Sequence, residues 1–260
     1  MGTKVKETCT VLSQECIGKD IYSMWLQTKT IAENAKPGQF VSVYTQDGGK
    51  LLPRPISLCE IDKEKGTLRL VYRVTGPKTG TESFSRLTVG AQLDILGPLG
   101  NGFPLEEAAG KKVFLMGGGI GVPPMLETMK QLEAEKIAIL GYRDELFLNE
   151  EFAKNGQTYI ATEDGSAGTK GNVMDAIREN ALEADVIFAC GPKPMLRAIK
   201  AYAMEKEIPC WISMEERMAC GIGACLGCVC QSSEVDEHSH VHNKRVCKDG
   251  PVFRCQEVEL

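Results

Sequence analysis

The sequence has no uninterrupted apolar run long enough to cross a lipid bilayer, and its N-terminus has no apolar segment of the kind that directs secretion. Lys6 interrupts the pattern that N-terminal myristoylation requires. No long basic run is present either, and the formal net charge of -5 disfavours nucleic acid or another polyanion as the main partner. We therefore expect a cytoplasmic protein that binds neither membrane nor nucleic acid.

Disulfide bonds are not expected, although the 260-residue chain contains 11 cysteines, because thiols stay reduced in that compartment. Seven of the cysteines fall between Cys210 and Cys255, and such local density is typical of a metal site. The composition, 43% hydrophobic and 25% charged, is that of a folded protein rather than a disordered one. The length allows two domains of ordinary size and a small appendage.

The spacing of apolar segments and turn signals predicts three regions. Residues 1–102 alternate short β-type segments with Pro-Gly and Gly-Gly turns, which favours an antiparallel barrel. Residues 103–212 alternate buried strands with amphipathic helices, which favours a parallel sheet with crossover helices. Residues 213–260 show no periodic core pattern, so we expect something besides packing to organise them. The expected fold class is β + α/β, with a small C-terminal domain.

The C-terminal region contains the spacing C-x4-C-x2-C at Cys220, Cys225 and Cys228, with Cys247 further along the chain. This is the spacing of plant-type 2Fe–2S clusters, which are held by four cysteine thiolates. The glycines in between let the backbone wrap closely around a cluster and donate N–H groups to its sulfurs. A zinc site with four cysteine ligands is the alternative, although such sites usually pair two C-x2-C units. Cys230 is either a substitute ligand for Cys228 or a buried thiol beside the site.

All three histidines lie close together, at His238, His240 and His242. A Rieske centre needs histidine among its ligands, and the four positions here are already filled by cysteine. We therefore expect a solvated loop at the histidines rather than a second metal site. The remaining cysteines that we interpret as small core residues are Cys9, Cys16, Cys59, Cys210 and Cys255.

A glycine-rich run from Gly117 to Gly121 follows an expected strand and precedes an expected helix. Glycines at such a turn let a pyrophosphate approach the helix N-terminus, and Pro124 suits the first helical turn. The run predicts a dinucleotide site at Gly117, Gly119, Gly121 and Pro124, with a tight turn that binds nothing as the alternative. No pair of basic residues placed for a 2′-phosphate follows the second strand, which favours NAD over NADP.

The tetrapeptide Arg54-Pro55-Ile56-Ser57 lies at the end of an expected barrel strand. Its arginine is suited to pair with a diphosphate, and Ser57 is suited to hydrogen-bond the edge of a flavin. Taken alone, the tetrapeptide is a weak signal, and a structural turn is the favoured interpretation.

Taken together, the segments RPIS, GGGIGVPPML, ACGPKPML, EERMACGIGACLGCVC and RVCKDGPVF resemble the ferredoxin reductase family. Within that family they are most similar to the electron-transfer subunits of class 1B dihydroorotate dehydrogenases, over essentially the whole chain. The resemblance implies a flavin-binding β-barrel in residues 1–102, a nicotinamide-binding α/β domain in residues 103–212 and a 2Fe–2S domain in residues 213–260.

The resemblance also implies which residues hold the cofactors. Cys190, in the CGP turn, would lie near the nicotinamide, although packing at the end of a strand is an equal alternative. Many family members have an aromatic residue where Ile56 stands, so the stacking partner of the flavin ring stays open. The implied residues are Arg54, Pro55, Ile56, Ser57, Val71, Tyr72, Arg73, Gly80 and Thr81 for FAD, Gly117, Gly119, Gly121 and Pro124 for NAD, and Cys220, Cys225, Cys228 and Cys247 for the cluster.

The function implied by the resemblance is electron transfer in de novo pyrimidine (UMP) biosynthesis. Dihydroorotate would be oxidised at the FMN of a separate catalytic subunit, and its electrons would reach NAD by way of the cluster and FAD. The implied assembly is a heterotetramer with two subunits of each kind. One alternative is an iron-sulfur flavoprotein reductase subunit serving ferredoxin, sulfur compounds or a hydrogenase. Another is a zinc-stabilised nucleotide-binding regulator, which would be colourless. An adaptor with decayed motifs is disfavoured by the intact cysteine spacing.

Overall fold

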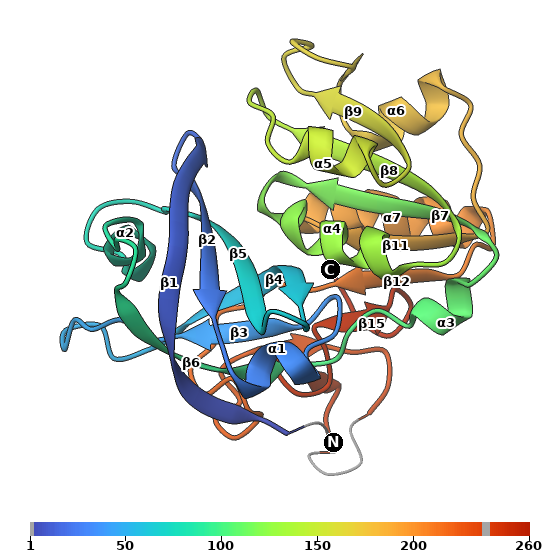
Figure 1. The fold of residues 1–260 in the computed structure, drawn as a ribbon. Helices are drawn as coiled ribbons and strands as arrows, with labels where there is room; N and C mark the ends of the chain where they lie inside the picture. The colour runs from blue at the N-terminus through green and yellow to red at the C-terminus, as the bar shows by residue number, and fades with distance from the viewer. Residues whose placement is uncertain (1–2, 236–239) are drawn as a thin grey trace.

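The computed structural model describes residues 3–235 and 240–260, and its N-terminal part is a closed antiparallel barrel (Figure 1). The barrel strands are β1 (Val5–Gly18), β2 (Ile21–Gln27), β3 (Phe40–Val43), β4 (Arg54–Asp62), β5 (Thr67–Arg73) and β6 (Gln92–Leu99). They close in the order β1-β2-β5-β4-β3-β6, with β4 between β3 and β5. Because successive side chains of a strand face opposite sides, Val41 and Val43 in β3 belong to the barrel core. The short helices α1 (Thr30–Asn34) and α2 (Gly80–Ser85) lie in the connections.

The second part is a sheet with helices on both faces (Figure 1). Its strands are β7 (Lys112–Gly118), β8 (Glu135–Tyr142), β9 (Gln157–Thr162), β10 (Thr169–Lys170), β11 (Val186–Cys190) and β12 (Cys210–Ser213), which pair in parallel. Its helical segments are α3 (Leu105–Ala108), η1 (Gly119–Gly121), α4 (Pro123–Gln131), α5 (Asn149–Ala153), α6 (Val173–Glu179) and α7 (Lys193–Glu205). Residues of α4 and α5 pack in one apolar cluster and residues of α6 and α7 in another, which places the two pairs on opposite faces.

The strand order of this sheet reverses beside β7. The chain runs outward through β8, β9 and β10 and then returns to β11, which pairs with the other side of β7. Such a reversal leaves a crevice at the carboxyl ends of the two central strands, where open α/β sheets bind their ligands. The topology of the sheet therefore predicts a ligand-binding site at the carboxyl ends of β7 and β11.

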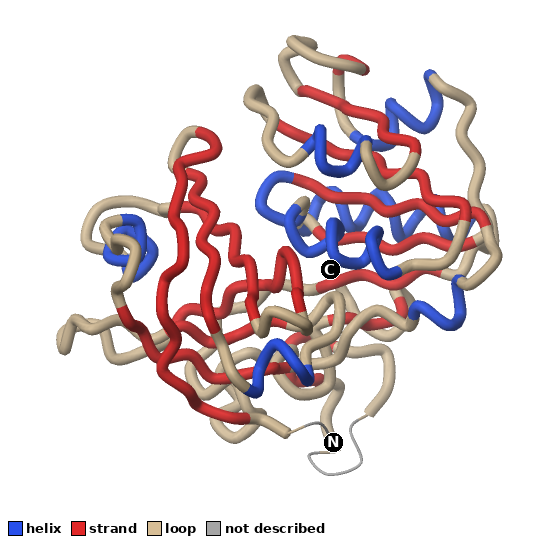
Figure 2. Tube along the Cα trace, viewed as in Figure 1, coloured by secondary structure: helices blue, strands red, loops and turns tan. Residues whose placement is uncertain are grey.

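The C-terminal region consists mostly of loops (Figure 2). It contains the antiparallel pair β13 (Val229–Gln231) and β14 (Asn243–Arg245), and β15 (Val252–Arg254), which joins the large sheet antiparallel to β12. The backbone N–H of Asn101 donates to the carbonyl of Gly250 at 2.7 Å, so this region is also tied to the end of the barrel. The expected fold class, an N-terminal antiparallel barrel followed by a parallel-sheet α/β part and a small C-terminal part, is confirmed.

None of the helices in the described part of the chain combines the length and the apolar character that a membrane span requires.

The barrel and the α/β sheet contact each other through α4, which packs against β4. Glu127 of α4 is buried, and its Oε2 accepts a hydrogen bond from the backbone N–H of Ile61 at 2.8 Å. Burial raises the pKa of this carboxyl above its ordinary value. A side chain of α4 is thus hydrogen-bonded to the backbone of β4, which fixes the position of the helix on the strand.

A group of charged side chains crosses the same interface. Arg69 of β5 is 8% exposed, and its Nη1 lies 2.6 Å from Glu60 Oε1 and 2.7 Å from Glu151 Oε2. Glu60 belongs to β4, Glu151 belongs to α5, and Lys130 of α4 also pairs with Glu60. Burial acts to lower the pKa of Arg69, but the hydrogen bonds with Glu151 and Glu60 raise it above its ordinary value. Arg69 is therefore a cation shared by carboxylates of both parts.

Replacing Arg69 by alanine should lower the free energy of unfolding by about 2 kcal/mol, because the poorly solvated Glu60 keeps only Lys130 as a partner and the partly exposed Glu151 loses its cation. Urea denaturation of the cofactor-loaded protein would measure this change. As a matched control, Arg178→Ala removes an ion pair with Asp175 from an arginine whose side chain is 71% exposed. That variant should change the free energy by less than about 1 kcal/mol. Equal effects of the two substitutions would contradict the role assigned to Arg69.

Candidate functional site

The glycine-rich run lies at the carboxyl end of β7, where the strand order reverses. Gly117 ends up beside Cys190, the last residue of β11, because the two residues are paired in register. A Cβ atom on Gly121 would lie 2.3 Å from the carbonyl oxygen of Cys190, so only glycine permits this approach. Pro124 lies in the first turn of α4, directly after the run. The predicted dinucleotide residues and Cys190 are thus brought to one place.

The chemistry of Cys190 is that of a neutral thiol. Burial raises the pKa of Cys190 to about 12, although a hydrogen bond with Ser213 acts in the opposite direction. The thiolate, not the thiol, is the nucleophilic form of cysteine. Cys190 is therefore suited to contact a ring or to fill space at the end of β11, and not to attack a substrate.

Arg54 and Gly80, which are distant in sequence, meet at the edge of the barrel. A Cβ atom on Gly80 would lie 2.6 Å from Arg54 Nε, so the guanidinium lies directly on the backbone of Gly80. Arg54 Nη1 also donates to the carbonyl of Leu52. Thr81 follows Gly80 in α2 and is only partly buried. A guanidinium held against the start of α2 is suited to bind a phosphate group, which is the role predicted for Arg54.

Two predicted FAD residues point their side chains into the barrel. Ile56 is 6% exposed and packs in the barrel core, and Tyr72 is 3% exposed in the same core. The hydroxyl of Tyr72 donates to Gln14 Oε1 at 3.0 Å, and burial raises its pKa above the ordinary value. At these two positions, only backbone atoms are placed to contact a flavin bound at the barrel surface. The inward direction of Ile56 also shows why this position does not require an aromatic ring.

The neighbouring positions face outward. In the antiparallel pairing of β3 with β4, Ser57 lies opposite Phe40 and Pro55 lies opposite Ser42. Val71 belongs to the apolar cluster of the α/β part rather than to the barrel core, and β5 contacts η1. The segments predicted to bind FAD therefore border the segment predicted to bind NAD.

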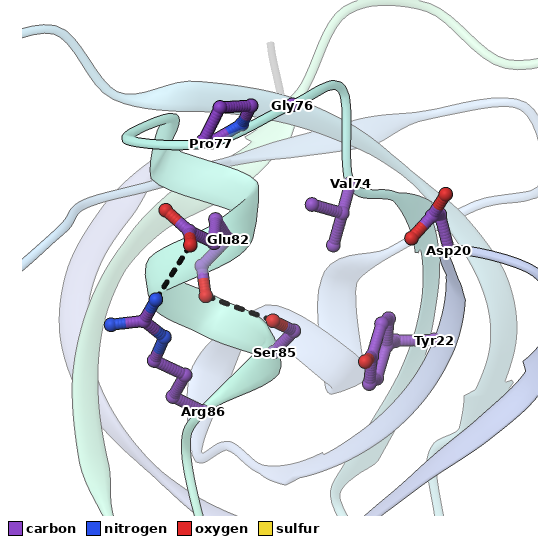
Figure 3. A pocket seen from close by; sticks show the side chains of 8 residues that line it. All are labelled: Asp20, Tyr22, Val74, Gly76, Pro77, Glu82, Ser85 and Arg86. Atoms are coloured by element: carbon purple, nitrogen blue, oxygen red, sulfur yellow. Dashed lines mark hydrogen bonds and ion pairs between the residues drawn. The ribbon is translucent and has the colours of Figure 1, made fainter.

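A cavity of about 560 Å³ opens beside α2, between this helix and the start of β2 (Figure 3). Glu82 accepts hydrogen bonds from Arg86 and Ser85 on its helix side, as the dashed lines show. The cavity adjoins the predicted FAD segments, since Val74 directly follows Arg73, but it does not include the Arg54 guanidinium. The phosphate-binding assignment therefore depends on the chemistry of Arg54 and not on this hollow. The residues that line the cavity are Asp20, Tyr22, Val74, Gly76, Pro77, Glu82, Ser85 and Arg86.

The four predicted cluster cysteines lie in and against one loop. Backbone N–H groups of this loop point at their sulfurs: Ala224 N lies 3.2 Å from Cys220 Sγ and Gly223 N lies 3.1 Å from Cys247 Sγ. Burial acts to raise the pKa of Cys220, but backbone N–H groups and the neighbouring thiol of Cys225 lower it to about 6. At Cys220 the loop thus stabilises negative charge on sulfur, which is what a thiolate ligand requires, whereas burial and the neighbouring Cys228 raise the pKa of Cys247 to about 12.

The cysteines are arranged as two pairs. The neighbouring thiol of Cys225 contributes to the shift in the pKa of Cys220, that of Cys228 contributes to the shift in the pKa of Cys247, and the backbone N–H of Cys247 lies 3.4 Å from Cys228 Sγ. Zinc takes its four ligands around one ion, whereas a two-iron cluster takes two cysteines on each iron. The donor set and its pairing therefore fit a 2Fe–2S cluster.

Cys247 is held against the loop by its neighbours. Arg245 pairs with Asp249, with 3.2 Å between Nε and Oδ2, and its Nη1 reaches the carbonyl of Gly223. Cys230, by contrast, is buried in β13, and its thiol lies 3.5 Å from the carbonyl of Lys244. This position agrees with a buried thiol beside the site. Of the three histidines, His240 and His242 are exposed, and His238 lies outside the described residues.

One polar residue near the cluster loop did not stand out in the sequence. Ser42 is buried on the outer side of β3, and a Cβ atom on Gly221 would lie 2.8 Å from its Oγ. Among the described residues, Ser42 Oγ is the buried side-chain oxygen or nitrogen that has no hydrogen-bond partner. An unsatisfied buried polar group costs about 1–3 kcal/mol. In the sequence, the only sign of Ser42 is that it is a polar residue within the otherwise apolar segment FVSVY.

Comparison with known proteins matches the first and the last part of the chain to family models. A family model described as the iron-sulfur cluster binding domain of dihydroorotate dehydrogenase B matches residues 215–259, and one described as an oxidoreductase FAD-binding domain matches residues 8–103. The electron transfer subunit of dihydroorotate dehydrogenase B (NAD(+)) from Geobacillus sp. (strain WCH70) is 47% identical, over 98% of this chain and 99% of the relative. Its counterpart from Bacillus caldolyticus is 46% identical with the same coverage.

Solved structures show the same fold. An NADH-dependent reduced ferredoxin-NADP oxidoreductase structure aligns with a TM-score of 0.83 and 27% identity, covering 96% of this chain and 89% of that chain. A flavohemoglobin from Malassezia yamatoensis aligns with a TM-score of 0.66 and 23% identity, covering 78% of this chain and 57% of that chain. The second likeness concerns the fold alone.

Replacing Arg54 by alanine should weaken the binding of FAD roughly 10- to 100-fold, the effect expected from losing a charge-assisted hydrogen bond to phosphate worth about 1.5–3 kcal/mol. Titration of the flavin-free protein with FAD, followed by flavin fluorescence, would measure the affinity. Arg86→Ala is the matched control, because Arg86 pairs with Glu82 on the same side of the barrel without lying on Gly80. Unchanged affinity in the Arg54 variant would refute the assignment.

Proposed function

Since this chain belongs to the family of electron transfer subunits of NAD(+)-dependent dihydroorotate dehydrogenase B, we propose that it conducts electrons from the catalytic subunit of such an enzyme to NAD, with a 2Fe–2S cluster and FAD as carriers. When bound, the cluster exchanges single electrons, and the flavin links one-electron transfer to hydride transfer. The observation that supports the proposal is that the segments predicted to bind the cluster, FAD and NAD adjoin one another. The cysteine loop lies on β3, β3 pairs with the RPIS strand β4, and β5 contacts the glycine turn η1.

The residues of the chain then have positioning roles. Arg54 and the backbone of Gly80 and Thr81 hold the FAD diphosphate, and Ser57 and the backbone of Val71–Arg73 border the flavin ring. Gly117, Gly119, Gly121 and Pro124 receive the dinucleotide, and Cys190 packs beside the nicotinamide as a neutral thiol. No side chain is required as an acid or a base. This assignment is supported by the meeting of Arg54 with Gly80 and of Gly121 with Cys190.

Cys220, Cys225, Cys228 and Cys247 would hold the cluster, Cys220 with Cys225 as one pair of ligands and Cys228 with Cys247 as the other. This proposal is supported by the two thiol pairs and by the N–H groups that point at their sulfurs. The proposed domains are residues 1–102, 103–212 and 213–260. The free cysteines of the chain suit a reducing compartment, so we expect the protein in the cytoplasm.

The partner is the catalytic subunit that oxidises dihydroorotate, as the name of the family implies. We propose that this subunit carries FMN and that the assembly contains two subunits of each kind. A ferredoxin-directed role is the second candidate, because an NADH-dependent ferredoxin-NADP oxidoreductase shares the fold at 27% identity. The relatives at 46–47% identity favour dihydroorotate.

Replacing Cys225 by serine should abolish electron transfer from dihydroorotate and the partner subunit to NAD, while NADH still reduces the bound flavin. The physical reason is that the flavin and dinucleotide segments lie on strands that do not contain the cysteine loop. Anaerobic absorption spectra, with iron, sulfide and flavin assays before and after addition of NADH, would report both activities. The prediction that Cys16 is a core residue is wrong, since this residue is exposed, so Cys16→Ser serves as the control and should leave both activities intact. Full dihydroorotate-dependent reduction of NAD by the Cys225 variant would disprove the proposed path.

The partner should dock over the exposed side of the cysteine loop. Cys225 is exposed there, and the large apolar side chains of Ile222 and Leu226, which belong to the same loop, are also exposed. Contiguous exposed apolar side chains are typical of interaction sites. A subunit that delivers electrons must approach its acceptor closely, and this is the accessible side of the cysteine pairs.

Leu226→Asp should therefore weaken association with the catalytic subunit roughly 30-fold, the effect of losing about 2 kcal/mol at an interface hot spot. Leu226 has φ 58°, a conformation that aspartate tolerates better than leucine, so the fold should be kept. Sedimentation of mixtures of the two subunits would give both affinity and stoichiometry. Val89→Asp, at a residue that is 70% exposed on the barrel, is the control. An unaltered affinity would move the docking face elsewhere, and a complex with one subunit of each kind would refute the heterotetramer.

A further inference from the structure

We infer that Ser42 is a positioning residue for the 2Fe–2S cluster: its hydroxyl, brought against the cysteine loop by barrel strand β3, donates a hydrogen bond to a sulfur atom of the cluster and raises its reduction potential. The inference rests on the proposed function, since it concerns the cluster that the four cysteines would hold.

The position of Ser42 follows from the alternation of β3. Val41 and Val43 face the barrel core, so Ser42 between them faces outward. It lies opposite Pro55 of the RPIS strand β4 on one side and opposite Leu96 of β6 on the other. Ser42 is nevertheless only 1% exposed, because the C-terminal region covers this outer face. The side chain is thus enclosed between the flavin strand and the cysteine loop.

The hydroxyl of Ser42 points at the backbone beside the first cysteine of the loop. A Cβ atom on Gly221, the residue after Cys220, would lie 2.8 Å from Ser42 Oγ and 3.1 Å from Leu99 Cδ1. Gly221 has φ +69°, so both its backbone conformation and its lack of a side chain are needed for the approach. Leu99 offers no acceptor. The polar groups that this hydroxyl faces therefore belong to the cysteine loop.

The hydroxyl nevertheless has no partner within the described protein. It is the buried side-chain oxygen or nitrogen left unsatisfied among the described residues. Buried polar groups in folded proteins are almost always hydrogen-bonded, and an exception calls for a ligand or ion that completes it. A serine hydroxyl can donate one hydrogen bond, and the sulfurs of a cluster held by Cys220 are acceptors.

The rest of the loop already supplies donors of this kind. Backbone N–H groups of Gly223, Ala224 and Gly227 point at the sulfurs of Cys247, Cys220 and Cys225. Ser42 would add a side-chain donor from the barrel side of the loop. Reduction adds one electron to the cluster and no bond is made or broken, so a hydrogen bond to sulfur favours the reduced, more negative form.

The test is the midpoint potential of the cluster in the full chain, measured by redox titration with electron paramagnetic resonance of the reduced cluster. Ser42→Ala should shift the midpoint to a more negative value with iron, sulfide and FAD contents unchanged. Ser42→Thr keeps the hydroxyl and should restore a midpoint close to the parent value. Ser85→Ala, which removes a serine hydroxyl bonded within α2, should not shift it.

An unchanged cluster midpoint in a fully loaded Ser42→Ala protein would overturn the inference and leave the proposed function intact. A shift of the flavin midpoint alone would also overturn it, because the hydroxyl would then serve the flavin. Failure of Ser42→Thr to restore the midpoint would show that packing, and not the hydroxyl, sets the potential. A parent protein without iron and sulfide would instead refute the proposed function itself.

Discussion

The pairing of β4 with two barrel strands is the constraint on which the arrangement of the sites depends. On one side β4 pairs with β3, whose outer face lies against the cysteine loop, and on the other it pairs with β5, which contacts η1. Helix α4, which directly follows the dinucleotide turn, packs on β4 itself. One strand thus relates the flavin segment to both the cluster segment and the nicotinamide segment. A shift of its register would separate all three, because each contact is made through a different face or edge of the same strand.

The interface between barrel and sheet is stabilised by groups that are costly to bury. Glu127 accepts a hydrogen bond from the backbone of β4, and Arg69 is shared by Glu60 of the barrel and Glu151 of the α/β part. Such groups fix geometry more effectively than they add stability, because a small displacement leaves a poorly solvated charge without its partner. Apolar packing alone would permit sliding of α4 over β4. The charged contacts restrict that sliding, which suits a protein whose carriers must stay at fixed separations.

The sequence indicates the fold class and the cluster more reliably than the directions of individual side chains. The spacing of Cys220, Cys225 and Cys228 is informative because three of the four proposed ligands come from one short loop. The glycine run is informative because it predicts the turn between β7 and α4. Tyr72 and Ile56 are different cases: a motif names the residue but does not specify which face of the strand it occupies, and both side chains face the barrel core. The pairing of β15 with β12 could not be predicted from the sequence, because a strand of three residues is too short to show a hydrophobic periodicity. Ser42 could not be identified because its significance arises only from a contact with Gly221, far along the chain.

The four cysteines differ in exposure, so the proposed cluster site has a solvent-facing side and a buried side. Cys225 is exposed and Cys220 partly buried, whereas Cys228 and Cys247 are buried. The first pair, Cys220 and Cys225, therefore lies nearer the solvent than the second pair, beside the apolar side chains proposed for docking. The loop next to this same pair also contacts the barrel, through Gly221 and Ser42. The exposed pair consequently has both an outward side, which a partner subunit can reach, and an inward side against the strand that pairs with the flavin segment. An electron carrier requires both sides, and a zinc site that only stabilises a fold requires neither.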